Sequence, residues 1–277
     1  RVVFFYLQIM NNLIPEKIIC ITEETTETIY LLGEEKRLIG ISGFTKRPKI
    51  AKKQKEVVST FLDADIEKII ELEPDLVIGF SDIQSSIAEK LIKKGVTVLI
   101  NNYRSINGIF KMIYNVGCLV GKSEASKDLI NEIKNKHKQI ANKTSKWKKK
   151  PKVYFEEWDN PQISGIKWVS EIIHLCGGND IFIEHSNESL AKDRIISSND
   201  VIKKNPDIII ASWCGKKVKK EKIKKRNGWE KIKAVKNNEI HEIKSEIILQ
   251  PGPASIIDGV ELIHEIFSNW YKRNIVS

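Results

Sequence analysis

The stretch "IIELEPDLVIGFS" at residues 69–81 places the end of an amphipathic helix, a proline and a buried strand in immediate succession. Proline blocks continuation of the helix, and the aspartate after it favours a turn. A similar stretch, "VIKKNPDIIIASW", occurs at residues 201–213. Two such helix–turn–strand units, separated by about half a chain, predict two lobes of similar design.

Short apolar runs bounded by turns alternate with stretches of helical period along the whole chain. In "IQSSIAEKLIKKG" at 83–95, isoleucine and leucine recur at three- and four-residue steps, which is typical of an amphipathic helix. Strands that alternate with helices indicate βαβ units and a mostly parallel sheet in each lobe, flanked by helices. The predicted strands are 17–22, 37–42, 75–80, 96–101, 152–158, 207–212 and 239–244, and the last helix runs from about Ser255 to Lys272.

The segment between the two halves, 121–151, carries one apolar stripe from Ala125 to Ile140 among charged residues and ends at Pro151. It predicts a helix over 123–142, about 30 Å long, that joins the lobes as a stiff strut. The expected domains are an N-terminal α/β lobe at 13–120, an inter-lobe helix at 121–150 and a C-terminal α/β lobe at 151–277.

The composition sets broad limits on the class of protein. Of the 277 residues, 41% are hydrophobic, which is enough for one large or two modest cores. No apolar run reaches the length of a membrane-spanning helix, so we expect a soluble body. The first ten residues, "RVVFFYLQIM", read equally well as the remnant of a signal sequence, as a foreign extension or as the flank of a native start at Met10.

The chain is basic, with a net charge of +10 and an isoelectric point near 9.2. Such a balance is compatible with an anionic partner. The lysine-rich runs "KWKKKPK" at 146–152 and "KKVKKEKIKKR" at 216–226 contain no recognisable nucleic-acid motif. We interpret both runs as solvated surface in a chain with biased codon usage, and we expect no nucleic-acid partner.

The sequence gives little support to catalysis or to a metal site. The four cysteines are far apart and show no metal-ligand spacing: Cys20, Cys118, Cys176 and Cys214. A serine nucleophile elbow and a phosphate-binding glycine loop are both missing from the sequence. We therefore predict no catalytic residues, no metal and no enzymatic activity. An enzyme that uses Cys214 with Glu156 or His241 is the alternative hypothesis.

Ligands of open α/β sheets bind beyond the carboxyl ends of the strands. Aromatic residues at these positions favour a pocket with aromatic walls, although a single aromatic after a strand is more often part of the core. The aromatics are Phe44, Phe80, Trp158 and Trp213, with Trp168 at the next helix start and Cys214 beside Trp213. Charged residues near the same strand ends and lobe edges are Asp82, Arg104, Glu156, Glu157 and Arg194. The two adjacent glutamates either meet the ligand or simply cap a helix or pair with lysines.

Several longer motifs carry a family resemblance. They are "FEEWD" at 155–159, "ISGIKWVSE" at 163–171, "SWCGK" at 212–216, "HEIKS" at 241–245 and "ILQPGPA" at 248–254. With these motifs, the sequence from about Leu13 to Trp270 resembles the helical-backbone (class III) substrate-binding proteins of ABC importers, most closely the cobalamin-binding-protein-like branch. Members of this family bind vitamin B12, iron-siderophores and haem.

The resemblance implies two α/β lobes joined by one long helix, with a small molecule held between them. It implies a monomer that works with an ABC transporter permease. The expected location is periplasmic or membrane-associated and extracytoplasmic, or cytoplasmic if Met10 is the native start. The first expectation for the ligand is a corrinoid such as cobalamin, and the second is a metal chelate, either a siderophore or haem. The charged groups near the strand ends suit a smaller polar ligand equally well, and no resident cofactor is expected.

The same resemblance implies roles for individual residues. Phe44, Phe61 and Phe80 match the aromatics that face the corrin in the first lobe of the cobalamin binder. Glu246 lies in a segment that supplies an acidic ligand contact in the second lobe. Glu67 matches one of the two glutamates with which the family docks on its permease, and Asp200 lies next to the second position.

Overall fold

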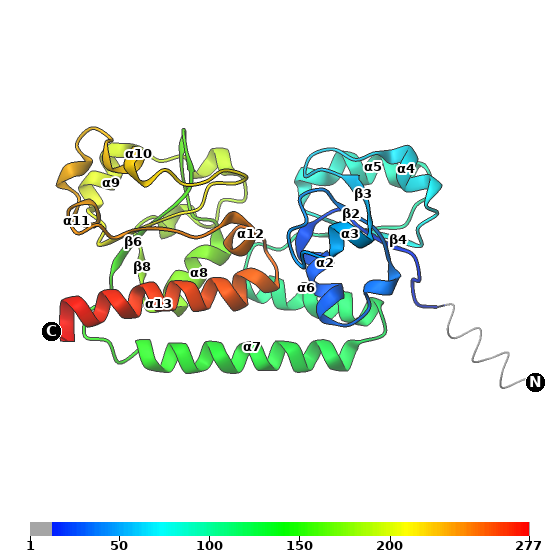
Figure 1. Ribbon diagram of the computed structural model, residues 1–277, viewed down its shortest axis with the longest axis horizontal. Coiled ribbons are helices and arrows are strands. Elements are labelled where there is room, and N and C mark those ends of the chain that lie inside the picture. The colour runs from blue at the N-terminus through cyan, green and yellow to red at the C-terminus, as the bar shows by residue number, and fades with distance from the viewer. Residues whose placement is uncertain (1–12, 277) are drawn as a thin grey trace, which may run out of the picture. The chain divides into compact units, whose positions relative to one another are not determined.

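The computed structural model describes residues 13–276, which divide into two compact units (Figure 1). Unit 1 comprises 13–103 and 107–131, and unit 2 comprises 104–106 and 132–276. Each unit contains one sheet flanked by helices, which confirms the predicted α/β class. The long helix expected at 123–142 is confirmed as α7 (Ser123–Thr144), which begins in unit 1 and ends in unit 2. Within 13–276, no helix combines the length and the apolarity needed to cross a membrane.

All five strands of unit 1 are parallel, in the order β3-β2-β1-β4-β5. Four confirm the predicted runs: β1 (Ile18–Cys20), β2 (Leu38–Ser42), β4 (Leu76–Phe80) and β5 (Val98–Asn101). Sequence analysis misses β3 (Glu56–Ser59), because its first two residues are exposed at the sheet edge and leave no buried apolar run. The helices are α2 (Glu23–Leu31), α3 (Ala51–Gln54), α4 (Ile66–Glu71), α5 (Ser85–Lys93) and α6 (Ile106–Leu119), with short 3₁₀ turns at Glu35–Arg37 and Asp82–Gln84.

The sheet of unit 2 is parallel except at one edge. Its parallel neighbours β10 (Ile240–Glu242), β9 (Ile208–Ala211) and β6 (Lys152–Asp159) confirm the predicted strands. The end of β6 pairs antiparallel with β7 (Gln162–Ser164), and its start pairs in parallel with β8 (Asn179–Asp180). Sequence analysis misses β7 and β8, because two or three residues are too few to show a period.

The helices of unit 2 are short apart from the first and the last. They are α8 (Lys167–Leu175), α9 (Ser198–Lys204), α10 (Lys220–Lys224), α11 (Lys233–Lys236), α12 (Ser245–Ile248) and α13 (Val260–Tyr271), with 3₁₀ turns at Ile183–His185, Ala191–Arg194 and Trp229–Lys231. A π-helical turn, Ser255–Gly259, leads into α13, and a second one, Lys272–Val276, follows it. The final helix expected from Ser255 to Lys272 is therefore confirmed.

The two aspartates of the repeated stretches make the same backbone contacts. Oδ2 of Asp75 accepts a hydrogen bond from the N–H of Lys17 at 2.8 Å, and the N–H of Asp75 donates to the Lys17 carbonyl at 2.8 Å. Oδ2 of Asp207 accepts from the N–H of Lys152 at 2.9 Å, and the N–H of Asp207 donates to the Lys152 carbonyl at 2.8 Å. Each aspartate thereby connects the start of its own strand to the start of the neighbouring strand.

The residue before the proline also matches between the two stretches. Glu73 and Asn205 both have a φ of +48°, in the left-handed region that side-chain-bearing residues adopt only uncommonly. This turn lies between a helix and a strand in both cases, α4 and β4 in unit 1 and α9 and β9 in unit 2. The repeat recognised in the sequence is therefore a structural repeat.

The cores of the two units differ in kind. A cluster in unit 1 is aliphatic and consists of Ile19, Ile21, Val58, Ile69, Val77, Ile87 and Leu91. In unit 2, the ring of Tyr154 packs edge-on against Phe182 and Trp229, with ring centres 5.7 and 6.1 Å apart. Trp213 joins this aromatic core and is only 2% exposed.

Candidate functional site

The carboxyl ends of the five parallel strands of unit 1 lie along one edge of the sheet, and apolar side chains are exposed there. Phe44 follows β2 and Phe61 follows β3, and they are 46% and 39% exposed. Leu62, which directly follows Phe61 in the chain, is also exposed, and so is Ile83, which follows β4. We call these four residues the apolar rim. Exposed apolar side chains gathered at a ligand-binding edge are typical of an interaction site.

A buried amide holds this edge together. Oε1 of Gln84 accepts from the N–H of Phe80 at 2.9 Å, and its Nε2 donates to the carbonyls of Ile21 and Phe61 at 3.2 and 3.1 Å. Gln84 is fully buried, and it thus ties three strand ends together and fixes the backbone of Phe61. Gly79 makes room for it, since a Cβ there would lie 2.8 Å from Oε1. Sequence analysis places Gln84 after a strand but does not assign it this role.

The backbone at the end of β4 is held in an uncommon conformation. Ser81 has a φ of +59° and is fully buried. Its N–H donates to the carbonyl of Asn101 at 2.9 Å, and its Oγ accepts from the N–H of Ile83 at 3.2 Å. Strained residues of this kind cluster at binding sites, where surrounding contacts compensate the strain. Here they direct Ile83 to the rim.

Two further predicted residues of unit 1 differ in exposure. Phe80 is 7% exposed and belongs to the interior, because it is the last residue of a strand buried along its whole length. The structure therefore corrects the expectation that Phe80 faces a ligand. Asp82 is exposed and lines a shallow hollow of about 460 Å³ together with Ile92 and Asn102. Arg104, at the start of unit 2, is half-buried.

Unit 1 also contains a buried acid that sequence analysis does not single out. Glu24, in the first turn of α2, is 2% exposed, and its Oε1 has no hydrogen-bond partner. Burial raises the pKa of Glu24 from 4.5 to about 7; hydrogen bonds from its own backbone and from Thr22 oppose this rise, and the nearby Glu27 adds to it. Glu27 itself pairs with Arg47, whose Nε lies 2.7 Å from Oε1. An acid in the first turn of a helix is usually exposed and interacts favourably with the helix dipole. The sequence therefore does not indicate that Glu24 is buried.

In unit 2, Glu156 is an interior residue rather than a ligand contact. Its carboxylate is fully buried and lies 2.5 and 3.0 Å from the two terminal nitrogens of Arg226. It also accepts from the Oη of Tyr154 at 3.1 Å and from the Nε1 of Trp213 at 3.0 Å. Burial and the charge of Glu156 raise the pKa of Tyr154. The structure thus corrects two expectations, since both Glu156 and Trp213 serve the core.

Glu157 has a comparable partner. Its two oxygens lie 2.5 and 2.9 Å from the terminal nitrogens of Arg194, a bidentate ion pair. Arg194 is 1% exposed and also donates to the carbonyl of Ser164. The structure therefore corrects the expectation that this arginine meets a ligand. Its burial results from the 3₁₀ turn Ala191–Arg194, which packs against β7.

Asp159 is the third acid of this segment with an internal partner. It accepts from Nζ of Lys216 at 2.5 Å and from Nζ of Lys222 at 2.6 Å. Burial alone would raise the pKa of Asp159, but the hydrogen bonds and charges of the two lysines lower it below its usual value. Nζ of Lys216 also lies 3.9 Å from the ring centre of Trp158 and 5.0 Å from that of Trp213, as in a cation–π contact.

The remaining predicted residues of unit 2 fall into two groups. Trp168 is 4% exposed and donates its Nε1–H to the carbonyl of Ile248 at 2.9 Å, so the structure corrects its expected role to a core residue. Trp158 and Glu246 are half-buried, and Cys214 is exposed directly after β9. The alternative enzyme hypothesis pairs Cys214 with Glu156 or His241. Glu156 instead pairs with Arg226, and His241 lies 2.9 Å from Glu239.

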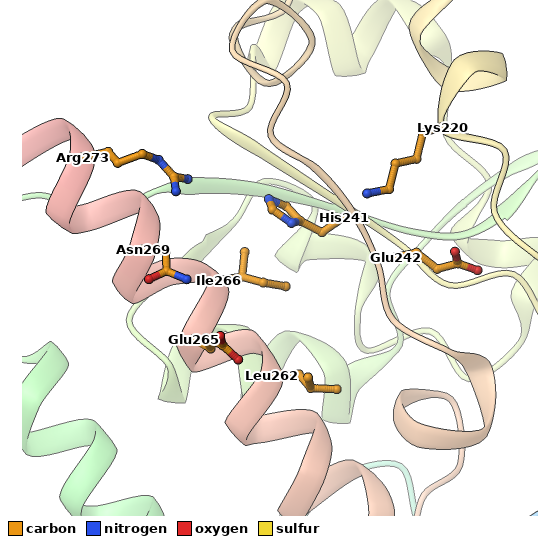
Figure 2. A pocket seen from close by; sticks show the side chains of 8 residues that line it. All are labelled: Lys220, His241, Glu242, Leu262, Glu265, Ile266, Asn269 and Arg273. Atoms are coloured by element: carbon orange, nitrogen blue, oxygen red, sulfur yellow. The ribbon is translucent and has the colours of Figure 1, made fainter.

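A second hollow, this one in unit 2, lies against the edge strand β10. It has a volume of about 490 Å³, and Figure 2 shows side chains from β10 and α13 around it. Its lining mixes charges of both signs with two apolar residues: Lys220, His241, Glu242, Leu262, Glu265, Ile266, Asn269 and Arg273. Of the residues singled out from the sequence, His241, named in the alternative enzyme hypothesis, lines this hollow, and none of the predicted ligand-binding residues does. Among residues 13–276, no cluster of three or more His, Cys, Asp or Glu side chains is arranged to hold a metal ion.

The two residues matched to permease docking are both exposed, each in the first turn of a short helix. Glu67, in α4, lies 3.6 Å from Nζ of Lys94 in an exposed ion pair. Asp200, in α9, accepts from the Oγ of Ser197 at 2.7 Å, and its N–H donates back to that oxygen at 3.2 Å. α4 and α9 are equivalent elements of the structural repeat, so the two acids occupy related places in the two units.

Comparison with known proteins assigns the family. Residues 18–247 match the family described as periplasmic binding protein. The chain belongs to this family. The resemblance to ABC-importer substrate-binding proteins drawn from the sequence motifs is thereby confirmed.

Curated relatives and solved structures agree with this assignment. The chain is 27% identical to an uncharacterized ABC transporter substrate-binding lipoprotein, YvrC, of Bacillus subtilis, over 94% of this chain and 82% of that protein. It is 25% identical to a vitamin B12-binding protein of Vibrio vulnificus, over 92% of this chain and 90% of that protein. A crystal structure from Staphylococcus epidermidis, of a possible iron-binding, periplasmic solute-binding protein, superposes with a TM-score of 0.78 at 26% identity and covers 91% of this chain and 98% of that one.

Proposed function

We propose that this substrate-binding protein captures a corrinoid and delivers it to an ABC permease outside the cytoplasm, without enzymatic turnover. The observation that carries the proposal is the apolar rim of unit 1. A corrin ring offers a broad apolar face, and burying the faces of Phe44 and Phe61 against it would supply about 1.5–3 kcal/mol for each ring. The related vitamin B12-binding protein of Vibrio vulnificus supports the choice of ligand.

The chemistry of unit 2 argues against a small zwitterionic ligand. The acids that suggested such a ligand, Glu156, Glu157 and Asp159, are matched by cationic side chains of the protein itself. A charged ligand group would have to replace these ion pairs, at the cost of breaking buried contacts. The accessible groups Trp158, Cys214 and Glu246 are instead proposed to orient the periphery of a largely apolar ligand, together with Asp82 and Arg104.

An iron chelate, either haem or a siderophore, is the second candidate. Cys214 is exposed at the carboxyl end of β9, where a thiol can reach a ligand, and a structural relative is described as a possible iron-binding protein. Cobalt in a corrinoid arrives with its ring nitrogens and its own axial ligands, whereas haem iron usually needs an axial side chain from the protein. Loss of Cys214 should therefore abolish most of the affinity for haem, whereas it should weaken corrinoid binding only slightly, because there the thiol makes a peripheral contact alone.

The test is a calorimetric titration of ligand-stripped protein with cyanocobalamin and, separately, with haemin. One-to-one binding of cyanocobalamin with a micromolar or tighter Kd, about −8 kcal/mol, is expected. Phe44→Ala and Phe61→Ala should each weaken it at least about tenfold, whereas Leu31→Ala, at an exposed apolar residue in the last turn of α2, should leave it unchanged. No heat with cyanocobalamin, or equal losses in all three variants, would overturn the corrinoid proposal.

Permease coupling has its own test. Glu67 and Asp200 are proposed to meet basic residues on the permease, so Glu67→Lys and Asp200→Lys should each reduce ligand uptake into permease-bearing proteoliposomes. Ligand affinity in solution should remain unchanged, because both side chains are exposed on short helices and neither belongs to the apolar rim. Uptake that is unaffected by both substitutions would exclude these two positions from docking.

A further inference from the structure

The positive charge of the chain is confined to one of its two units. Unit 1, over 13–103 and 107–131, has 16 Lys and Arg against 17 Asp and Glu. Unit 2, over 104–106 and 132–277, has 29 against 19. A biased codon usage would enrich lysine in both units alike. The excess of Lys and Arg over Asp and Glu therefore lies in unit 2, and biased codon usage does not explain it.

Within unit 2, the two lysine-rich runs differ in how their charge is matched. In the run at 216–226, Lys216 and Lys222 pair with Asp159, and Arg226 pairs with Glu156. Much of this run thus stabilises the fold. In the run at 146–152, no lysine ammonium group has a carboxylate within 4 Å among residues 13–276. The same holds for two flanking lysines, Lys143 and Lys272.

A stack of aromatic rings lies where α7 and α13 end, and the unmatched lysines are close to its rings along the chain. The ring of Trp147 lies parallel to that of Tyr271, with centres 4.7 Å apart, and His264 stacks 6.2 Å away. The N–H of Lys148 donates to Oη of Tyr271 at 3.3 Å. Nζ of Lys149 lies 6.0 Å from the ring centre of Trp270. The stack therefore fixes the position of a segment that would otherwise be a free loop.

The basic corner, as we name it, consists of six lysines that are exposed or half-buried: Lys143, Lys146, Lys148, Lys149, Lys150 and Lys272. Six like charges repel one another, which destabilises the fold unless an anionic partner compensates. Holding them in place with stacked aromatic rings increases that repulsion compared with a flexible loop. A purely solvated surface would not require such a device.

We propose that the basic corner binds the anionic surface of a lipid membrane. Lysines close to an anionic bilayer contribute about 1 kcal/mol each, and tryptophan and tyrosine are favoured at the level of the headgroups. The half-buried rings of Trp147 and Tyr271 lie among the lysines, as in such an interface. Nucleic acid is the less suitable partner, because the ring of Trp147 is already stacked between those of Tyr271 and His264 and does not offer itself to a base.

The test is sedimentation of the full-length protein with vesicles of phosphatidylcholine alone or mixed equally with phosphatidylglycerol. The protein should bind the mixed vesicles at low salt and dissociate at about 0.3 M salt, since screening shortens the range of the interaction. The variant with Lys146, Lys148, Lys149 and Lys150 all changed to Gln should bind at least about tenfold more weakly. Circular dichroism should show that it remains folded.

The matched control changes four exposed lysines of the other run to Gln: Lys217, Lys219, Lys220 and Lys225. Both variants lose four positive charges from unit 2, so they differ only in which part of that unit loses its charge. We expect it to bind the mixed vesicles within about twofold of the unaltered protein. Equal losses in both variants would show an effect of net charge alone and overturn the proposal. Equal binding to both kinds of vesicle, or preference for a DNA duplex over the mixed vesicles, would also overturn it.

Discussion

The carboxyl edges of the two sheets are built by opposite means. In unit 1, the neutral amide of Gln84 ties three strand ends together, and the surface above it is apolar. In unit 2, the segment after the middle of β6 is held by ion pairs to Arg226, Arg194 and Lys216. The same strand–turn–helix repeat underlies both edges. An acidic stretch of sequence therefore marks a charged site only where no later segment supplies the matching cations.

The largest expected effect tests whether charge holds unit 2. Arg226→Met keeps the contact with Trp229 but leaves the fully buried Glu156 without its cation, so unfolding should become about 3–5 kcal/mol easier. All six tryptophans lie in unit 2, so urea unfolding followed by tryptophan fluorescence reports on this unit.

The control for this prediction adds Glu156→Gln to Arg226→Met. The amide carries no charge: its oxygen can accept from the Nε1–H of Trp213, and its NH2 can donate to the Oη of Tyr154, which accepts as well as donates. The double variant should therefore recover at least half of the lost stability. A loss below 1 kcal/mol in the single variant would show that unit 2 does not depend on its ion pairs, and the contrast between the edges would disappear.

The next prediction concerns Glu24, the acid of unit 1 whose Oε1 has no partner. Its pKa is raised from 4.5 to about 7 in the folded state, so the folded protein holds a proton that the unfolded chain has released between these values. Stability should therefore fall as pH rises from 4.5 to 7. Glu24→Gln should abolish this fall and stabilise unit 1 by up to about 3 kcal/mol at pH 8, with little change at pH 4.

Hydrogen exchange of peptides from unit 1 is the suitable measurement for Glu24→Gln, because this unit lacks tryptophan. Glu23→Gln, which changes the neighbouring first-turn acid of α2, is the matched control: it retains Glu24, so its stability should still fall as pH rises from 4.5 to 7. A Glu24→Gln variant that is equally destabilised at pH 4 and pH 8 would contradict the predicted burial of a charge.

A third prediction tests the neutral edge directly. Gln84→Leu leaves the N–H of Phe80 and the carbonyls of Ile21 and Phe61 without their partner, so unit 1 should lose about 2 kcal/mol. Ligand affinity should fall as well, since the backbone of Phe61 is no longer fixed. Gln54→Leu removes only an exposed contact to Tyr30 and should cost less than about 0.5 kcal/mol. Similar losses in the two variants would deny Gln84 a special role.

The smallest effect is expected at Asp159. Its lowered pKa means that its ion pairs stabilise the folded state above pH 3.8 and that this contribution is lost as pH falls through the folded-state value. Changing both Lys216 and Lys222 to Met should move the midpoint of acid unfolding to higher pH and cost about 1 kcal/mol at pH 7, because both lysines are largely exposed. Lys217→Met should leave the acid midpoint, followed by tryptophan fluorescence, unchanged.

The sequence predicts the fold well because its signals are local. Buried apolar runs, a proline after the helix of each repeated stretch and one long apolar stripe each act within a few residues, and the strands, the repeat and α7 follow from them. The strands that sequence analysis misses, β3, β7 and β8, depend on pairing with distant neighbours and have no apolar period of their own.

The site is predicted less completely for the same reason. The exposure of Phe44 agrees with its predicted position after a strand, whereas Phe61, singled out by the family resemblance alone, is exposed after a strand that the sequence does not predict. Glu156 and Arg226 are 70 residues apart, and no spacing rule connects them. A sequence shows that an acid follows a strand, but whether a cation from a later loop reaches it depends on the assembled sheet.

The paired aspartates of the structural repeat bear on how quickly the two units form. Asp75 closes a loop of 58 residues back to Lys17, and Asp207 closes one of 55 residues back to Lys152. The entropy lost in closing these loops differs by only about 0.05 kcal/mol, because the cost grows with the logarithm of length. The pairings of β1 with β4 and of β6 with β9 thus meet nearly the same entropic cost of loop closure. Refolding should therefore organise both sheets on similar timescales, with neither unit serving as a template for the other.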